Sequence, residues 1–594
     1  MAERPASATE PATGPEGQPS QTVAPAAECQ VSGMGSPYIP VDSWVYPAML
    51  RLYSLGYVDT VYLGMRPWTR TSVAHMLEEA ADRIDDDEGT PAGDQAQEIY
   101  DALMHELRYD LSGPCMAWKG QARIESAYTV MRGMTGTPLR DSYHLGSSIV
   151  NDYGRPFEGG FNNYTGVSAY ATAGRFSLYV RGEFERAPSA TGYSAALAET
   201  LAAIDGTYGQ QTNDVYYNQA TIPMGPIGST FRGRIQEAVI AANVLNHSIS
   251  FGKHDQWLGP AQGGSFAYSN NAENIYGFQI NRVEPLRIPL LSRLTGPFRY
   301  EILVGALRGH TYIPNANYPG ANQPNVTNPG DPWVHVEKIS FRPTEDLEFG
   351  FSRTVIWGGQ GHEPITIHSF LKSFFSFQNV TAAEKYGRDD PGARFGQFDF
   401  SWRLPYMKKW LTLYTDSEVH DDISAIDAPR RGAWRPGLYL SHVPGAPRLD
   451  LRAEGVYTDP PVGSSAFGRF MYFETIQRQG YTNQGQIFGD WMGREGKGGQ
   501  AWVTYHLSGN EWLQANYRRQ KVAKDFIAIP NSTQYGTTLD DFGFQAVKRF
   551  GKDFEVNGSF TAEHYLAPIY LPGRQTVTNT NIQLTWYPSR RTNF

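Results

Sequence analysis

The last fourteen residues of the chain, "NIQLTWYPSRRTNF" (581–594), contain the pattern that decides the fold class. Ile582, Leu584 and Trp586 alternate with more polar residues, which predicts a strand with one apolar and one polar face. In a soluble protein the apolar face would pack in a core. In an outer-membrane barrel it would face lipid, and the polar face would line the lumen.

The same alternation recurs along the chain. Residues 163–187, "NYTGVSAYATAGRFSLYVRGEFERA", 499–520, "GQAWVTYHLSGNEWLQANYRRQ", and 542–565, "FGFQAVKRFGKDFEVNGSFTAEHY", each predict two strands around a tight turn. Long loops such as 308–333, "RGHTYIPNANYPGANQPNVTNPGDPW", separate these hairpins. Short turns alternating with long loops favour an outer-membrane barrel. The alternative is a β-sandwich or a propeller, but a propeller would need a repeat of about 40–50 residues, and the sequence has none.

The composition agrees with a barrel. Of the 594 residues only 19% are charged and 13% are aromatic, and 61 are glycine. The mean hydropathy is −0.44, and no run approaches the roughly 18 apolar residues of a membrane helix. A helical membrane protein is therefore excluded, whereas a barrel is not. The net charge of −9 argues against a nucleic-acid-binding protein, which would need a basic face.

The N-terminal part has a different pattern. Residues 1–37 are rich in Pro, Ala and Ser, lack the apolar region of a signal peptide, and predict a disordered segment. Apolar residues at helical spacing then predict three short helices within Val41–Tyr109. We therefore expect a helical bundle over 38–115 and a barrel over 116–594.

Sequence signatures of enzymes and metal sites are missing from the chain. It contains no GxSxG, HExxH or Walker A motif. Cys29 and Cys115 belong to no CxxC or Cys/His cluster, so we expect no zinc site, and the sequence leaves open whether they pair. We expect a non-enzymatic protein without cofactors.

Three segments resemble the capsule-assembly outer-membrane proteins of the Wzi type. They are "FGKHDQWLGPAQGGSFAYSNNAENIYGFQINR" (251–282), "VHVEKISFRPTEDLEFGFSRTVIWGGQG" (334–361) and "GQFDFSWRLPYMKKWLTLYTDSEVHDD" (396–422). The resemblance covers most of the chain after about residue 38. It implies a barrel of about 18 strands in the outer membrane of a Gram-negative-type bacterium, with the helical bundle at the periplasmic end. It also implies a lectin-like role, holding exported capsular or extracellular polysaccharide at the cell surface.

The first of these segments also contains a candidate sugar site. Sugars bind to flat aromatic faces and to planar amides or carboxylates. Trp257, Asn270 and Asn271 supply both kinds of group, beside His254 and Asp255. Alternatively, the Asn-Asn pair forms a turn and Trp257 packs a loop against the barrel rim. Two adjacent ligands such as His254 and Asp255 do not make a metal site.

Paired acids are the remaining candidates. Asp421-Asp422 ends a predicted strand, where it can bind a cation or sugar hydroxyls, whereas Asp389-Asp390 is predicted to be an exposed loop pair. Adjacent residues of a strand point to opposite faces, so neither pair makes a good catalytic dyad.

Two rival functions share parts of this pattern. A porin-like channel for small polar solutes has the same fold with an open lumen, and a soluble β-rich carbohydrate-active enzyme has a similar composition.

For the lectin-like barrel we expect three partners: polysaccharide, outer-membrane lipid, and the barrel-assembly machinery, which would recognise the C-terminal strand.

Overall fold

The structure is a computed structural model, and it describes most of the chain. The described residues are 34–111, 120–142, 146–194, 196–197, 218–220, 225–309, 311–313, 331–359, 363–378, 380–385, 388–407, 409–420, 431–460, 471–473, 479–522, 537–589 and 591–593. The predicted disordered segment 1–37 therefore falls almost entirely outside them, as do Cys29 and Cys115.

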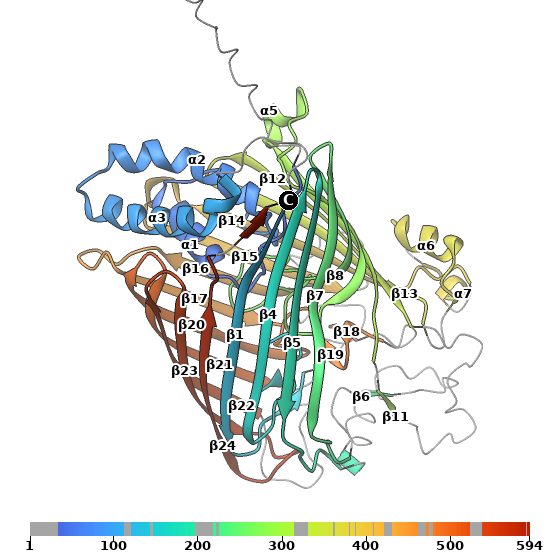
Figure 1. The fold of residues 1–594 in the computed structure, drawn as a ribbon. Helices are drawn as coiled ribbons and strands as arrows, with labels where there is room; N and C mark the ends of the chain where they lie inside the picture. The colour runs from blue at the N-terminus through green and yellow to red at the C-terminus, as the bar shows by residue number, and fades with distance from the viewer. Residues whose placement is uncertain are drawn as a thin grey trace, which may run out of the picture.

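Eighteen antiparallel strands close into a barrel (Figure 1). Closure occurs at β1, which pairs with β4 on one side and with β24 on the other. The strands are β1 (Gly120–Thr135), β4 (Gly160–Ala173), β5 (Phe176–Ala187), β7 (Thr230–Val244), β8 (His247–His254), β9 (Ile275–Arg282), β10 (Phe298–Ala306), β12 (Trp333–Thr344), β13 (Leu347–Trp357), β14 (Ala393–Arg403), β15 (Leu411–His420), β16 (Ala433–Leu440), β17 (Leu449–Tyr457), β20 (Gly496–Ser508), β21 (Glu511–Val522), β22 (Thr537–Phe550), β23 (Phe554–Leu566) and β24 (Arg574–Trp586). The predicted fold class is confirmed.

The remaining strands are two or three residues long. β25 (Arg591–Asn593) extends the C-terminal strand and pairs with the start of β1. The others form small ladders within the loops: β2 (Arg140–Asp141) with β3 (Gly146–Ser147), β6 (Asn218–Ala220) with β11 (Thr311–Ile313), and β18 (Thr482–Asn483) with β19 (Gln486–Ile487).

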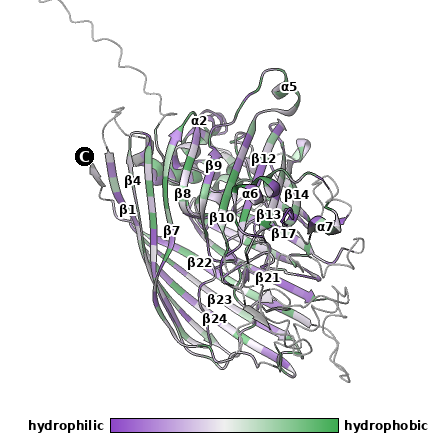
Figure 2. Cartoon of the chain, turned by 90° about the vertical axis from the view of Figure 1, so that its right-hand side faces the viewer, coloured by the Kyte–Doolittle hydropathy of each residue, from purple (hydrophilic) through white to green (hydrophobic). Residues whose placement is uncertain are grey.

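The two faces of the terminal strand lie as the alternation predicts. Ile582, Leu584 and Trp586 point outward and are 44–45% exposed, whereas Thr585 on the opposite face is buried. Hydrophobic and hydrophilic residues alternate along the barrel strands in the same way (Figure 2). Because the outward residues are apolar and the buried inward ones are largely polar or charged, the wall suits lipid outside and a polar lumen inside.

Connections of different length lie at the two ends of the barrel. At one end most turns are short, such as those at residues 174–175, 245–246, 345–346 and 509–510. At the other end the connections are long, such as 188–229, 358–392 and 458–495. The helices α1–α3 and the C-terminus lie at the short-turn end (Figure 1).

Three N-terminal helices, α1 (Val45–Leu55), α2 (Arg70–Asp86) and α3 (Pro91–Leu111), pack around one apolar core. The side chain of Thr69 caps α2 by accepting a hydrogen bond from the backbone nitrogen of Ser72. α1 is almost completely buried, and the core around it also includes Tyr414 and Tyr439 from the barrel wall. The bundle is therefore packed against the lumen.

Salt bridges and hydrogen bonds attach the bundle to the barrel. Arg403 at the end of β14 donates hydrogen bonds of 2.6 Å to the backbone oxygen of Tyr53 and to Asp59.

The other helices of the structure are short: α5 (Leu291–Thr295), α6 (Ile367–Phe374), α7 (Ala382–Lys385) and the 3₁₀ turn η2 (Pro405–Met407). Within the described part of the chain, no helix is long and apolar enough to span a bilayer.

Two connections from the long-loop end fold inward, residues 255–274 and 479–495. They hold each other through the hydrogen bond from the Ser269 nitrogen to the Phe488 oxygen, 2.8 Å long. Together they form an apolar core against the inner faces of β10 to β17, with Phe266, Tyr481 and Trp491 nearly inaccessible. We call residues 255–274 the inward loop.

Candidate functional site

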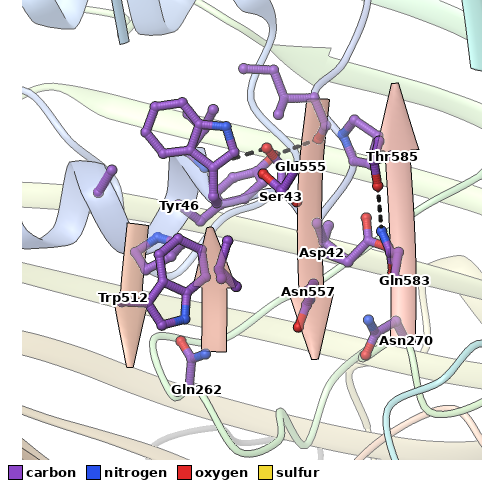
Figure 3. Close-up of a pocket in the computed structure, with 18 of the residues that line it drawn as sticks. Asp42, Ser43, Tyr46, Gln262, Asn270, Trp512, Glu555, Asn557, Gln583 and Thr585 are labelled. Carbon is purple, nitrogen blue, oxygen red and sulfur yellow. Dashed lines mark hydrogen bonds between the residues drawn. The ribbon is translucent and has the colours of Figure 1, made fainter. Parts of the chain in front are cut away.

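A cavity of about 550 Å³ lies inside the barrel (Figure 3). Its walls are the segment leading into α1, the inner faces of β16, β17, β20 to β24, β1, β4 and β5, residues of the connection between β1 and β4, and part of the inward loop. The inward-folded connections pack against the inner faces of β10 to β17, and the cavity extends from β16 and β17 along β20–β24 to β1, β4 and β5. This volume is within the usual range of small-molecule sites.

Aromatic rings, planar amides and charged side chains line the cavity together. The tryptophans are Trp44, Trp257, Trp502 and Trp512, and the amides are Asn151, Gln262, Asn270, Gln514, Gln545, Asn557 and Gln583. Most of these side chains are only half-buried although they lie inside the barrel. Their polar atoms therefore face open space rather than a packed core.

The amides on the wall are oriented by their neighbours. Gln545 donates to Asn557, Gln583 donates to Thr585, and in each pair the two atoms lie 3.0 Å apart. An amide group has two N–H donors and an oxygen that accepts, so each of these side chains keeps capacity for a further hydrogen bond. The wall thus presents oriented donors and acceptors to the cavity.

A charged cluster that includes the lining residues Asp42 and Arg181 lies at one side of the cavity. The guanidinium of Arg181 donates two hydrogen bonds to the carboxylate of Asp42, 3.0 and 2.9 Å long. Asp255, in the inward loop just beyond β8, accepts from the Val41 nitrogen at 2.8 Å and from the Tyr153 hydroxyl at 3.0 Å. Burial, together with the nearby Asp42 carboxylate, raises the pKa of Asp255 to about 7.

The structure brings two of the sequence-predicted site residues to the cavity, Trp257 and Asn270. Trp257 is only 5% exposed, and its indole nitrogen donates to the Ala261 oxygen at 3.0 Å. Its ring packs with Val41 and Tyr153. The side-chain oxygen of Asn270 is buried and has no hydrogen-bond partner among the described residues.

Two other predicted residues, His254 and Asn271, lie apart from the cavity lining. His254 is buried in β8, 3.1 Å from the Gly277 oxygen. Asn271 joins the inward-folded connections, because its side-chain nitrogen donates to the Ile487 oxygen at 2.9 Å. Asp421 and Asp422 lie outside the described residues.

The expectation of an exposed pair at Asp389-Asp390 is wrong for Asp390. Asp390 is only 3% exposed, and its carboxylate accepts a hydrogen bond of 3.0 Å from the Gly392 nitrogen. The carboxylate thus stabilises the turn before β14.

Within the residues that the structure describes, no group of three or more His, Cys, Asp or Glu side chains can hold a metal ion.

Sequence reasoning missed the wall residues Trp502, Trp512, Gln545, Asn557 and Gln583. Their signal was present, because each occupies the polar or inward position of a strand whose alternation is visible. The alternation does not say which inward positions border a cavity and which meet the packed inward-folded connections.

A family model for the capsule assembly protein Wzi matches residues 130–580, which is most of the chain and nearly all of the barrel. The chain belongs to the Wzi family. A relative from Klebsiella pneumoniae, described as an uncharacterized 55.8 kDa protein in the cps region, is 28% identical over 186 residues. That match spans 31% of this chain and only 32% of the relative's length.

The solved structure of Wzi from Escherichia coli has the same fold. It superposes with a TM-score of 0.60 over 92% of this chain and 99% of that one, at 16% sequence identity. That protein is described as an outer-membrane protein involved in group 1 capsule assembly and as a carbohydrate-binding β-barrel. For the present member of the family, this likeness establishes the fold.

Proposed function

We propose that this protein is an outer-membrane barrel that binds capsular or extracellular polysaccharide at the cell surface without catalysing a reaction. The observation that carries the proposal is the lining of the cavity, where tryptophan rings and oriented planar amides face the same space. Sugars present C–H patches that fit aromatic faces and hydroxyls that pair with amides. Membership of the Wzi family and the description of the Escherichia coli protein support the same ligand class.

The orientation follows from the two ends of the barrel. Short turns face the periplasm and long loops face outward in outer-membrane barrels. The helical bundle at the short-turn end would then be periplasmic, and the inward loop would enter the lumen from the cell surface. The C-terminal strand, which closes the barrel against β1, is the element that we expect the barrel-assembly machinery to recognise.

Within the cavity, we propose that Trp512 and Gln583 contact sugar directly, because both are half-buried and line the same space. Asn270 borders the same cavity from the inward loop, and its buried side-chain oxygen has no hydrogen-bond partner among the described residues. Trp257 is more enclosed, and its role is to hold the inward loop in place.

Polysaccharide retention by the native bacterium tests the proposal. In a strain whose chromosomal copy carries Trp512→Ala with Gln583→Ala, we expect more polysaccharide in the medium and less on the cells. Gln575→Ala is the matched control, since Gln575 lies on the same face of β24 outside the cavity lining. If the double variant retains as much polysaccharide as the wild type and shows normal heat-modifiable gel mobility, the cavity is not the polysaccharide-binding site.

A further inference from the structure

Helix α6 (Ile367–Phe374) lies against the outer surface of the barrel rather than inside it. Its ring contacts are with outward residues of β12 and β13: Phe370 and Phe374 pack on His335, and Phe370 also packs on Trp357. Val334 and Ile356, the neighbours of these residues, point into the lumen and join the apolar core there. Figures 1 and 2 both place α6 outside the wall near β13.

The helix covers charged side chains on the outward face of the wall. Arg353 and Glu337 pair at 3.1 Å, and the His335 ring lies 2.5 Å from the second oxygen of Glu337. α6 supplies partners for two of them, since Arg353 donates to the Phe374 oxygen and His335 lies 2.5 Å from the Ser373 hydroxyl. His335 is completely buried as a result.

The opposite side of α6 is apolar and open. Ile367 is 80% exposed, Leu371 45%, and Phe375, directly after the helix, 64%. These three residues are spaced by four positions and therefore form one stripe along the helix. His368 and Lys372 form a polar stripe next to it, and both lie near the carboxylate of Asp389.

We propose that the apolar stripe of α6 inserts into the lipid of the outer leaflet. The stripe continues the lipid-facing surface of the wall, because the next outward pair below Glu337 and Arg353 is Ile339 and Phe351, followed by Phe341 and Phe349. Charged residues in the lipid band of a barrel are costly. α6 removes this cost by shielding the charged group and presenting apolar side chains in its place.

The geometry is that of an interfacial amphipathic helix. Such a helix lies in the plane of the bilayer surface with its apolar side in the acyl boundary and its polar side towards the headgroups. The polar stripe of His368 and Lys372 is at the edge of the apolar stripe, where it would meet the headgroup region. A short helix in a long loop of the barrel would thus anchor that loop to the membrane surface.

Spin labelling of the full chain in phospholipid vesicles tests this inference. In a background with Cys29→Ser and Cys115→Ser, a nitroxide is attached at Leu371→Cys, and its relaxation by oxygen and by a water-soluble nickel chelate is compared. Phe251→Cys, on the outward face of β8, is the lipid reference. Tyr406→Cys, fully exposed in the turn after β14, is the water reference.

We expect the ratio of oxygen to nickel relaxation at position 371 to resemble that at 251 and to exceed that at 406 several-fold. A ratio like that at 406 would place the stripe in water and overturn the proposal. Protection from both agents would mean that protein or polysaccharide covers α6, and would overturn it as well. The same label at Ile367→Cys gives a second reading if the Leu371 variant fails to show the heat-modifiable mobility of a folded barrel.

Discussion

Arg66 and Trp257 join the two elements that enter the lumen. The backbone nitrogen of each donates to the backbone oxygen of the other, over 3.0 and 3.1 Å. Arg66 lies between α1 and α2, and Trp257 lies in the inward loop, so the helical bundle and the loop meet inside the barrel. The contents of the lumen therefore form one continuous structure, supported from both ends.

Replacing Trp257 with alanine is expected to loosen this junction. Replacing a buried tryptophan with alanine lowers the free energy of unfolding by about 3–5 kcal/mol. Here the change removes the packing of the indole ring against Val41 and Tyr153. We expect faster amide hydrogen exchange in residues 57–68 and 255–274, with unchanged exchange in β20–β24. Trp257→Phe should retain most of the protection. If amide protection after Trp257→Ala is the same as in the wild type, the backbone hydrogen bonds between Arg66 and residue 257 do not depend on the indole ring.

The contact between His75 on α2 and Glu284 after β9 is expected to make the attachment of the bundle depend on pH. The two side chains lie 3.1 Å apart. The hydrogen bond to Glu284 raises the pKa of His75, and the same bond lowers the pKa of Glu284. The stabilisation from protonated His75 is complete below its ordinary pKa of 6.5 and is lost as pH rises through the raised pKa. The stabilisation from ionised Glu284 is complete above its ordinary pKa of 4.5 and is lost as pH falls through the lowered pKa.

The contribution of the pair should therefore be largest between pH 4.5 and 6.5. A double-mutant cycle with His75→Gln and Glu284→Gln, followed by hydrogen exchange of α2, measures it. The coupling should be present within this window and should decrease above it. A coupling that does not change with pH would rule out the protonated histidine as its source.

The two faces of β23 are expected to tolerate charge differently. Phe560 points outward and is 46% exposed, whereas Thr561 is on the inward face between the luminal Asn557 and the buried Glu563. Arginine on the lipid face near mid-bilayer costs about 2–4 kcal/mol. Phe560→Arg should therefore reduce the folded fraction on gels run without boiling, and Thr561→Arg should fold almost normally. Equal folding of both variants would contradict the assigned faces.

Removal of residues 41–110 is expected to leave a barrel that still inserts. The strand ladder closes through β1, β4 and β24 without any contribution from the helices. The lumen would lose α1 and its contacts with Tyr414 and Tyr439. Planar-bilayer conductance should rise above that of the full chain. If conductance stays the same, the bundle does not limit passage through the lumen, and this result would count against the bundle as a plug.

Much of the barrel could be predicted from strand alternation. A side-chain period of two is a local property of extended backbone, so Ile582 and Phe560 could be assigned to the lipid face before any contact was known. The same local argument placed the three helices, because apolar residues at helical spacing and the cap at Thr69 are also short-range signals.

The candidate site could be predicted only in part, because its members come from distant segments. Trp257 and Asn270 were found because they lie in one distinctive stretch. Gln583 and Trp512 line the same cavity from strands more than 200 residues away along the chain. Strand alternation places both side chains in the lumen, but it contains no information about which loop reaches them.

By itself, the sequence determined the closed barrel with its outward apolar face, because alternation and turn spacing are encoded within a few residues. Only the tertiary structure decided that residues 255–274 and α1 meet in the lumen, that the free space lies along β20–β24, and that α6 covers Arg353 from outside. These relationships depend on the inward folding of long connections. That folding is decided by contacts such as Phe266 with Asp416, whose partners are 150 residues apart, and no local pattern records such pairs.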